Sequence, residues 1–269
     1  MPSRTLWRGT LSFGLVTIPV GLYTAVEDRS PSFNQLRASD HAPIGYRRVA
    51  KVDGQEVDYE DIVKGYEYER DHYVVFDPDE LAALRPKSSR TIEIQQFVPL
   101  EQVDPIAYDR AYYLAPEPAG AKAYALLAQA MADRDVVAIC KVTIRDKEHL
   151  ATLRLREGIF VLSTMHWPDE IRAFSLSDAG IDELPEPRDR EIRMAHALIE
   201  DLTEDFDPRE FRDAYRERIL EAVQAKVAGQ EITAVETAEP AGVVDLMDAL
   251  KRSVEQSRQR KDRSSKAAS

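Results

Sequence analysis

The sequence predicts a mixed α+β protein, with an antiparallel β-barrel or sandwich followed by a helical appendage. Two observations lead to this fold class. Short segments of alternating apolar residues, separated by turn signals, fill most of residues 15–164. After Trp167 the apolar residues recur at steps of three and four, which is typical of helices. Strands that come first and helices that come later argue against an alternating parallel sheet.

Alternation and turns define the predicted strands. Residues 15–23 form a strand with one apolar face, and Pro19 indicates an edge position or a bulge. The dipeptide Asp53-Gly54 predicts a tight turn between two short strands within 44–59. Further strands are expected at 73–76, 90–98, 111–114, 136–145, 149–156 and 159–164.

The helices follow from spacing and capping residues. An acidic first turn at 77–80 predicts a short helix over Leu81 and Leu84, and residues 119–133 have helical spacing through Ala123, Leu126, Leu127, Ala130 and Met131. A helix over 188–206 carries a narrow apolar seam of Ile192, Ala195, Ile199, Leu202 and Phe206. A second helix is expected to begin at Asp207-Pro208 and to end near Gly229. Residues 230–241 resemble a linker, and 242–257 a short amphipathic helix.

Composition excludes several classes of protein. The chain has 269 residues, of which 43% are hydrophobic and 31% charged, as in ordinary globular proteins. No apolar run approaches the roughly 18 residues of a membrane helix, and the N-terminus does not look like a secretory signal. The single cysteine, Cys140, excludes an intramolecular disulfide, and we expect a cytoplasmic protein.

The net charge of −12 argues against a nucleic-acid ligand when it is taken alone. The charge is unevenly spread, however. Residues 1–52 and 251–269 carry net charges of +4 and +5, whereas 53–120 and 177–221 carry −10 and −8. Local fields decide whether an anion binds, so the basic zones are either binding surfaces or solvated faces.

No residue can be nominated as catalytic, and no metal or cofactor is predicted. A glycine-rich phosphate loop and a nucleophile elbow are both missing from the sequence. The five histidines are scattered without metal-ligand spacing, and Cys140 is expected to be a small buried hydrophobe.

One pair of predicted strands has a pattern with chemical meaning. If the strands pair through a turn at 146–148, one side is apolar and the other carries five cations, Lys141, Arg145, Lys147, Arg154 and Arg156, with Thr143 and Thr152 between them. Such a face suits phosphate oxygens rather than base edges. The alternative is a solvated sheet face that Asp146 and Glu148 partly neutralise.

Several uncommon strings resemble the bacterial Ku family, in order and at the expected spacings over roughly residues 4–228. They begin with Trp7-Arg8-Gly9-Thr10-Leu11-Ser12-Phe13-Gly14 and continue through Tyr23. The others lie at 46–49, 52–57, 62–68, 92–94, 97–100, 104–105, 112–116, 147–150 and 167–172.

This resemblance implies a function and an architecture. Ku-like proteins are DNA-end-binding proteins of non-homologous end joining, with an antiparallel, SPOC-like β-barrel core, a bridging arm and a C-terminal helical arm. The resemblance implies a barrel core with its bridge at 1–175, a dimerisation arm at 176–229, and a linker, short helix and basic tail at 230–269. It also implies a homodimer that rings double-stranded DNA ends, recruits an ATP-dependent DNA ligase, has no enzymatic activity and acts at the nucleoid.

The resemblance and the alternation together suggest site residues. The predicted DNA contacts are Arg37, Arg47, Arg48, Lys51, Lys64, Lys141, Arg145, Lys147, Arg154 and Arg156. The basic tail contributes Lys251, Arg252, Arg258, Arg260 and Lys261, and the predicted ligase-docking residues are Val243, Leu246, Leu250 and Val254. Two other hypotheses remain: a protein-interaction scaffold on the same barrel that has lost DNA binding, and a hydrolase that uses an unrecognised carboxylate pair.

Overall fold

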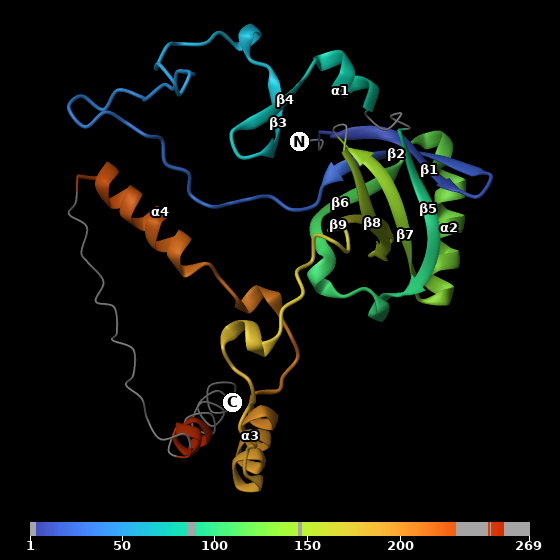
Figure 1. The fold of residues 1–269 in the computed structure, drawn as a ribbon. Coiled ribbons are helices and arrows are strands. Elements are labelled where there is room, and N and C mark those ends of the chain that lie inside the picture. The colour runs from blue at the N-terminus through green and yellow to red at the C-terminus, as the bar shows by residue number, and fades with distance from the viewer. Residues whose placement is uncertain (1–3, 85–89, 145–146, 230–246, 248, 256–269) are drawn as a thin grey trace. The chain divides into compact units, whose positions relative to one another are not determined.

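The structure is a computed structural model that describes residues 4–84, 90–144, 147–229, 247 and 249–255 (Figure 1). By their contacts the residues divide into two units, 1–29 with 33–173 and 30–32 with 174–269. The first unit contains a closed β-barrel, and the second contains the long C-terminal helices. The roles predicted for residues 1–175, 176–229 and 230–269 as barrel core with bridge, dimerisation arm and C-terminal tail stay a prediction.

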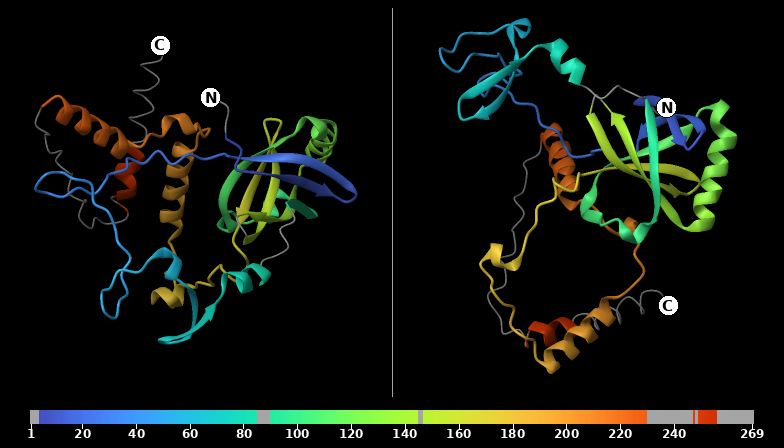
Figure 2. Two further views of the ribbon diagram at one scale, coloured as in Figure 1. Left: turned by 90° about the horizontal axis from the view of Figure 1, so that it is seen from above. Right: turned by 45° about the vertical axis from the view of Figure 1, so that its right-hand side comes forward.

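Seven strands close the barrel in the order β1-β2-β6-β9-β8-β7-β5. They are β1 (Trp7–Phe13), β2 (Val16–Thr24), β5 (Thr91–Pro99), β6 (Tyr108–Pro116), β7 (Val136–Ile144), β8 (Lys147–Arg156) and β9 (Ile159–Met165). Neighbouring strands are antiparallel except β1 and β5, which pair in parallel and complete the circle. The predicted mixed α+β class and the barrel are confirmed, and the views in Figure 2 show the strands curling around a common interior.

The N-terminal hairpin shows how local sequence determines the barrel. In β2, Ile18, Val20 and Leu22 are completely buried, as alternation predicts. Pro19 precedes the stretch of β2 that pairs with β6, so its missing N–H removes no ladder bond there. Gly9 of β1 is required sterically, because a Cβ at this position would overlap both the Arg90 carbonyl oxygen and the Trp7 ring.

Helix α2 (Ala121–Arg134) packs against the barrel, where it contacts β2, β7 and β8 (Figure 2). Its buried face is Tyr124, Leu127, Ala128 and Met131, whereas Leu126, predicted to lie on the apolar face, is 70% exposed. The Tyr124 hydroxyl explains the difference. It accepts a hydrogen bond from the Phe160 N–H (2.7 Å) and donates one to the Leu114 carbonyl (2.8 Å), so a tyrosine occupies the inward position.

The segment between β2 and β5 has little regular structure. A hairpin of β3 (Lys64–Glu69) and β4 (His72–Phe76) is followed by α1 (Pro78–Leu84). The predicted turn at Asp53-Gly54 is confirmed, with Gly54 at φ +73°, but the two strands predicted around it reduce to one isolated bridge, Val49 with Glu56. Side chains here are exposed, Val52 by 93%, so no packed face supports longer strands.

The second unit contains α3 (Asp189–Leu202) and α4 (Ala214–Val227). The predicted helix start at Asp207 is wrong. Asp207 caps only a 3-10 turn at Pro208–Glu210, and α4 begins after Asp213, whose side chain accepts a hydrogen bond from the Arg216 N–H. The predicted end is confirmed, because Gly229 follows α4 with φ +73°. Residues 249–255 are also helical.

Short 3-10 turns complete the fold, at Tyr59–Asp61, Leu100–Gln102, Pro105–Ala107, Pro118–Gly120, Leu176–Ala179 and Pro208–Glu210. Within the described ranges, no helix has both the length and the apolar character needed to cross a bilayer.

Candidate nucleic-acid interface

The hairpin of β7 and β8 is the first candidate surface. Ile144 pairs with Lys147, so the paired strands include Lys147, which the sequence places in the turn at 146–148. Lys147 therefore lies on the side of Ile144 and His149, and the prediction that it shares a face with Lys141 is wrong. A count of alternating positions that runs on from one strand into the next ignores the pairing across the hairpin, which is why the sequence pattern misplaced Lys147. Arg145 lies outside the described residues.

The outer face of this hairpin consists of Ile139, Lys141 and Thr143 from β7 and of Glu148, Leu150, Thr152, Arg154 and Arg156 from β8. The opposite side chains, such as Cys140 and Ala151, form the core. Thr152 is fully buried on the outer face, and its hydroxyl has no hydrogen-bond partner among the described residues. Part of this outer face is therefore inaccessible to solvent, unlike a sheet face that is fully solvated.

Carboxylates accompany most of the cations on this outer face. Lys141 Nζ lies 3.4 Å from Glu148 Oε2, and Arg156 Nε lies 3.6 Å from Glu157 Oε1. Glu93 of β5 stands directly opposite Lys141 in the ladder. For Arg154 no ion pair is found within the described ranges. The surface that the sequence predicts to be strongly basic is thus close to charge balance.

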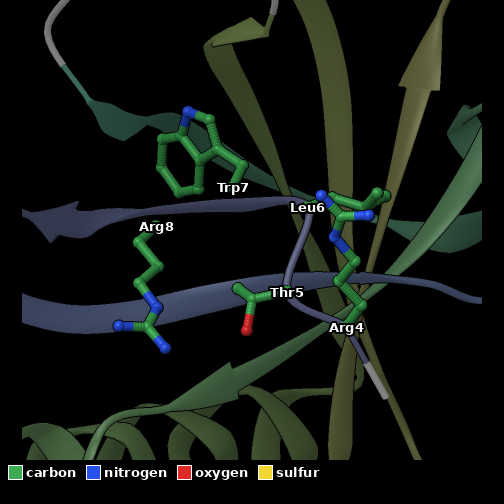
Figure 3. A pocket seen from close by; sticks show the side chains of 5 residues that line it. All are labelled: Arg4, Thr5, Leu6, Trp7 and Arg8. Atoms are coloured by element: carbon green, nitrogen blue, oxygen red, sulfur yellow. The ribbon is translucent and has the colours of Figure 1, made fainter.

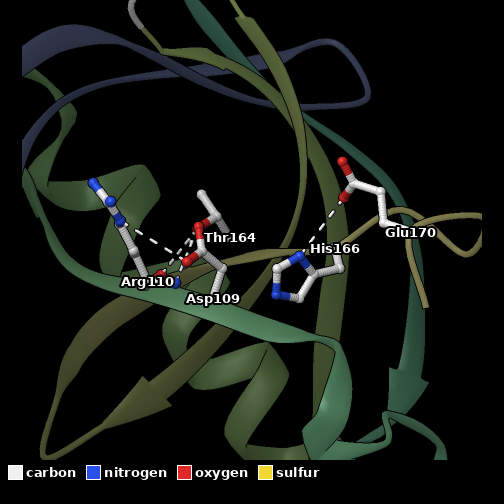
Figure 4. A network of polar contacts seen from close by, with 5 residues as sticks. All are labelled: Asp109, Arg110, Thr164, His166 and Glu170. Carbon is white, nitrogen blue, oxygen red and sulfur yellow. Dashed lines mark hydrogen bonds and ion pairs between the residues drawn. The ribbon is translucent and has the colours of Figure 1, made fainter. Parts of the chain in front are cut away.

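Trp167, just beyond β9, contacts the same face. Lys141 Nζ lies 5.8 Å from the centre of the Trp167 ring, within the range of a cation–π interaction. The Trp167 backbone N–H donates a hydrogen bond to Glu170 Oε2 (2.9 Å), and this bond lowers the pKa of Glu170. His166 Nδ1 lies 3.7 Å from the same carboxylate (Figure 4). The turn after β9 is therefore fixed at its start.

A bulge in β6 presents a cation that the sequence patterns did not indicate. The β6–β9 register shifts between Tyr108 and Ala111, and the Arg110 N–H in the shift donates to Thr164 Oγ1 at 3.1 Å (Figure 4). The Arg110 side chain is 70% exposed, with its Nε 3.9 Å from Asp109 Oδ1. A register shift depends on a distant strand, so alternation along β6 could not reveal it.

The second candidate group lies in the arm, residues 26–84. Arg37 donates to both carboxylate oxygens of Asp40, which lowers the pKa of Asp40. Arg47 Nη1 lies 2.9 Å from Glu56 Oε2, and the Arg48 guanidinium lies 5.2 Å from the centre of the Tyr59 ring. Both lysines of the group, Lys51 and Lys64, are exposed, and in the described part of the chain neither forms an ion pair.

The N-terminal strand contributes two further cations. Arg4 and Arg8 line an open depression of about 390 Å³ together with Thr5, Leu6 and Trp7 (Figure 3). Neither arginine stood among the predicted DNA contacts, although both belong to the basic zone 1–52. Regional charge was the signal that could have indicated them.

The structure describes only some of the site residues predicted for the C-terminal region. Lys251 and Arg252 are exposed on the short helix, and Leu250 and Val254 are half-buried. The other predicted residues of this region, Val243, Leu246, Arg258, Arg260 and Lys261, lie outside the described residues.

The described residues show neither a metal-binding cluster nor an activated thiol nucleophile. They contain no cluster of three or more His, Cys, Asp or Glu side chains that could hold a metal ion. Cys140 is completely buried, and its burial raises the thiol pKa to about 12, so it is not a nucleophile at neutral pH.

A family model and individual relatives, compared separately with this chain, indicate the same protein family. Residues 12–194 match the family model of the Ku70/Ku80 beta-barrel domain. The chain is 44% identical to the non-homologous end joining protein Ku of Desulfitobacterium hafniense, over 96% of this chain and 90% of that protein. It is 46% identical to the protein of the same name from Frankia casuarinae, over 93% of this chain and 63% of the relative. The chain thus spans less than two thirds of the Frankia protein.

Proposed function

Because the chain belongs to the Ku family, we propose that two copies form a ring that threads onto the ends of broken double-stranded DNA. In this proposal the ring contacts DNA without sequence specificity and supports non-homologous end joining. The protein itself catalyses no reaction, and an ATP-dependent DNA ligase joins the ends.

The observation that carries the proposal is the apolar surface outside the barrel. Tyr46, Tyr66 and Val75 of the arm are each more than half exposed. The same holds for Ile199, Leu202, Phe206, Phe211, Tyr215 and Val227 of the second unit. Exposed apolar area of this extent is unusual for a monomer and typical of an interface. A second copy of the chain would cover it, and a dimer is the simplest way to close a ring.

The charges are compatible with DNA inside such a ring. Phosphate contacts need cations only on the inner wall, so a net charge of −12 does not prevent binding. Lys51, Lys64 and Arg154 are candidates for this wall, because no carboxylate pairs with them in the described ranges. Contacts to phosphate carry no sequence information, and enclosure slows dissociation even when each contact is weak.

The test compares linear duplex with a covalently closed circle of the same sequence. A threading dimer binds the linear DNA and leaves the circle unbound, and sedimentation shows a mass of two chains. Equal binding to both DNAs would contradict threading, and a monomer at all concentrations would contradict the ring.

The ligase proposal has its own test. Deletion of residues 242–269 removes the apolar residues Leu250 and Val254 together with the basic tail. The shortened protein should still bind linear duplex and should no longer stimulate the ligase. If stimulation persists, the C-terminal segment is not the docking site.

A second candidate function is a protein-interaction scaffold without DNA binding. The charge balance on the outer face of β7–β8 favours it, because Glu148 and Glu157 lie beside Lys141 and Arg156 there, and Glu93 stands opposite Lys141. This candidate predicts a dimer that binds neither linear nor circular duplex at physiological salt.

A further inference from the structure

Lys141 occupies an unusual position on the outer face of β7–β8. It stands in a ladder row that crosses the sheet through Ser12, Glu93, Lys141, Leu150 and Met165. Glu148 is its diagonal neighbour on β8, and Trp167 follows Met165 by two residues. The ammonium group is thus held between a carboxylate at 3.4 Å and an indole ring at 5.8 Å.

We infer that Trp167 is a positioning residue for Lys141, which binds a backbone phosphate of DNA, and that Glu148 competes with that phosphate. This inference rests on the proposed function. It adds a role for two residues outside the predicted DNA contacts and gives their effects opposite signs.

Trp167 is suited to hold the lysine because its own position is fixed. Its backbone N–H donates to Glu170 Oε2 at 2.9 Å, which anchors the main chain at this point, and the residue is partly buried. From the end of β9 the ring reaches across β8 to Lys141 on β7. A ring face attracts the ammonium group without neutralising it, so the charge stays available to an anion.

Glu148 has the opposite effect, because it supplies an anion to the same ammonium. The side chains of Lys141 and Glu148 are 43% and 41% exposed, so a phosphate can reach the pair from solvent. Exposed ion pairs are weak, and a duplex presents a dense row of phosphates. DNA can therefore displace the carboxylate, at the cost of the ion pair.

The experiment measures the affinity for linear duplex across a salt series, for the full chain and three variants. Glu148→Gln should bind about two- to five-fold more tightly for each copy of the chain, since it removes the competitor. Trp167→Leu should bind about two- to five-fold more weakly for each copy. Lys141→Met should bind more weakly and reduce the salt slope by about one for each copy.

The decisive readout is the same pair of substitutions in the Lys141→Met background. The effect of Trp167→Leu should disappear there, because Trp167 acts on DNA only through Lys141, and the effect of Glu148→Gln should become smaller, since only direct repulsion of phosphate by the carboxylate remains. Glu101→Gln is the matched control: it removes one exposed carboxylate beyond the far end of β5 and should leave affinity unchanged. If Trp167→Leu still weakens binding without Lys141, its role is structural and the inference fails.

Failure of this inference is distinguishable from failure of the proposed function. If the unmodified protein does not bind linear duplex, the proposed function fails and the inference with it. If it binds ends while Glu148→Gln leaves affinity unchanged, or while Lys141→Met keeps the full salt slope, the function stands and the inference is overturned.

Discussion

The barrel and the rest of the chain bury their apolar residues to very different extents. In the barrel and α2, a single cluster of buried residues includes Leu11, Leu114, Leu153 and Phe160, each with no exposed surface. In the described parts of the arm and of the second unit, no residue is fully buried, although both are rich in aromatic and aliphatic side chains.

This difference shows where each region obtains its stability. The barrel and α2 bury one continuous apolar cluster within one chain, and burial of apolar surface is the main favourable term in folding. Helix α3 is amphipathic, yet neither α3 nor α4 buries a residue within the chain, and isolated helices of 14 residues are marginal in water. We propose that a second copy of the chain covers the apolar surface of the second unit, and this is the physical argument for the proposed dimer.

The largest expected effect comes from a change outside the barrel. Ile199→Glu together with Leu202→Glu places two carboxylates on the exposed seam of α3, where the side chains are 62% and 58% exposed. In an interface these charges would be buried without partners, so the dimer should dissociate. The affinity for linear duplex should fall by more than about 100-fold. Sedimentation and gel-shift experiments measure both results.

The barrel should not be affected by this double substitution. Its thermal unfolding transition is expected at the same temperature as in the unmodified protein. The matched control is Arg193→Glu, a charge change on the opposite side of α3 by helical periodicity, which should leave the dimer intact. A double variant that stays dimeric would show that the α3 seam is not the interface.

The second prediction concerns the core of the barrel. Leu153→Ala removes a completely buried side chain, and the resulting cavity should lower the free energy of unfolding by about 2–5 kcal/mol. The matched Leu220→Ala, in α4 where the side chain is 51% exposed, should change the barrel transition by less than about 0.5 kcal/mol. Urea denaturation followed by near-UV circular dichroism compares the two. Equal losses would mean that the regions unfold as one unit.

The contrast also explains how much of the fold the sequence could predict. Where one strand face is buried, as in β2, the apolar residues alternate, whereas β9 is buried on both faces and is a short apolar run. These patterns predict β2, β5, β7, β8 and β9 near their observed places. In the arm no face is buried, and the two strands predicted around Gly54 do not form. The parallel pairing of β1 with β5, which closes the barrel, joins residues about 80 positions apart and leaves no local signal.

The candidate site was harder to predict than the fold. Strand alternation directed attention to the β7–β8 hairpin, but the side on which Lys147 lies depends on its pairing with Ile144 across the hairpin. The carboxylates beside Lys141 come from β5 and β8, and Trp167 comes from beyond β9. These neighbours are brought beside Lys141 only by the folding of distant segments. The pattern of one strand does not include them, and it therefore overestimates the positive charge of the face.

The third prediction tests a polar contact inside the barrel. Tyr124→Phe removes the hydroxyl that joins the Phe160 N–H to the Leu114 carbonyl, and it leaves two buried groups without a partner. The free energy of unfolding should fall by about 1–3 kcal/mol. Tyr66→Phe in β3, where the side chain is 67% exposed, is the matched change outside the barrel and should have almost no effect. A neutral Tyr124→Phe would mean that water or backbone movement satisfies both groups.

The smallest expected effect is a pH dependence confined to the barrel. Partial burial of His149 in β8 lowers its pKa below the ordinary 6.5, and the positive charge of Lys147 lowers it further. The unfolded chain therefore binds a proton more readily than the folded one, so stability is complete above pH 6.5 and falls as the pH decreases through this value. Urea midpoints of the barrel transition measured between pH 8 and pH 5 should show the decrease.

The variant His149→Gln should flatten this pH dependence, whereas the control His196→Gln, exposed on α3, should retain it. A slope that survives in His149→Gln would assign the proton uptake to another group, and a slope lost in His196→Gln would show that the stability of the barrel depends on the helical unit.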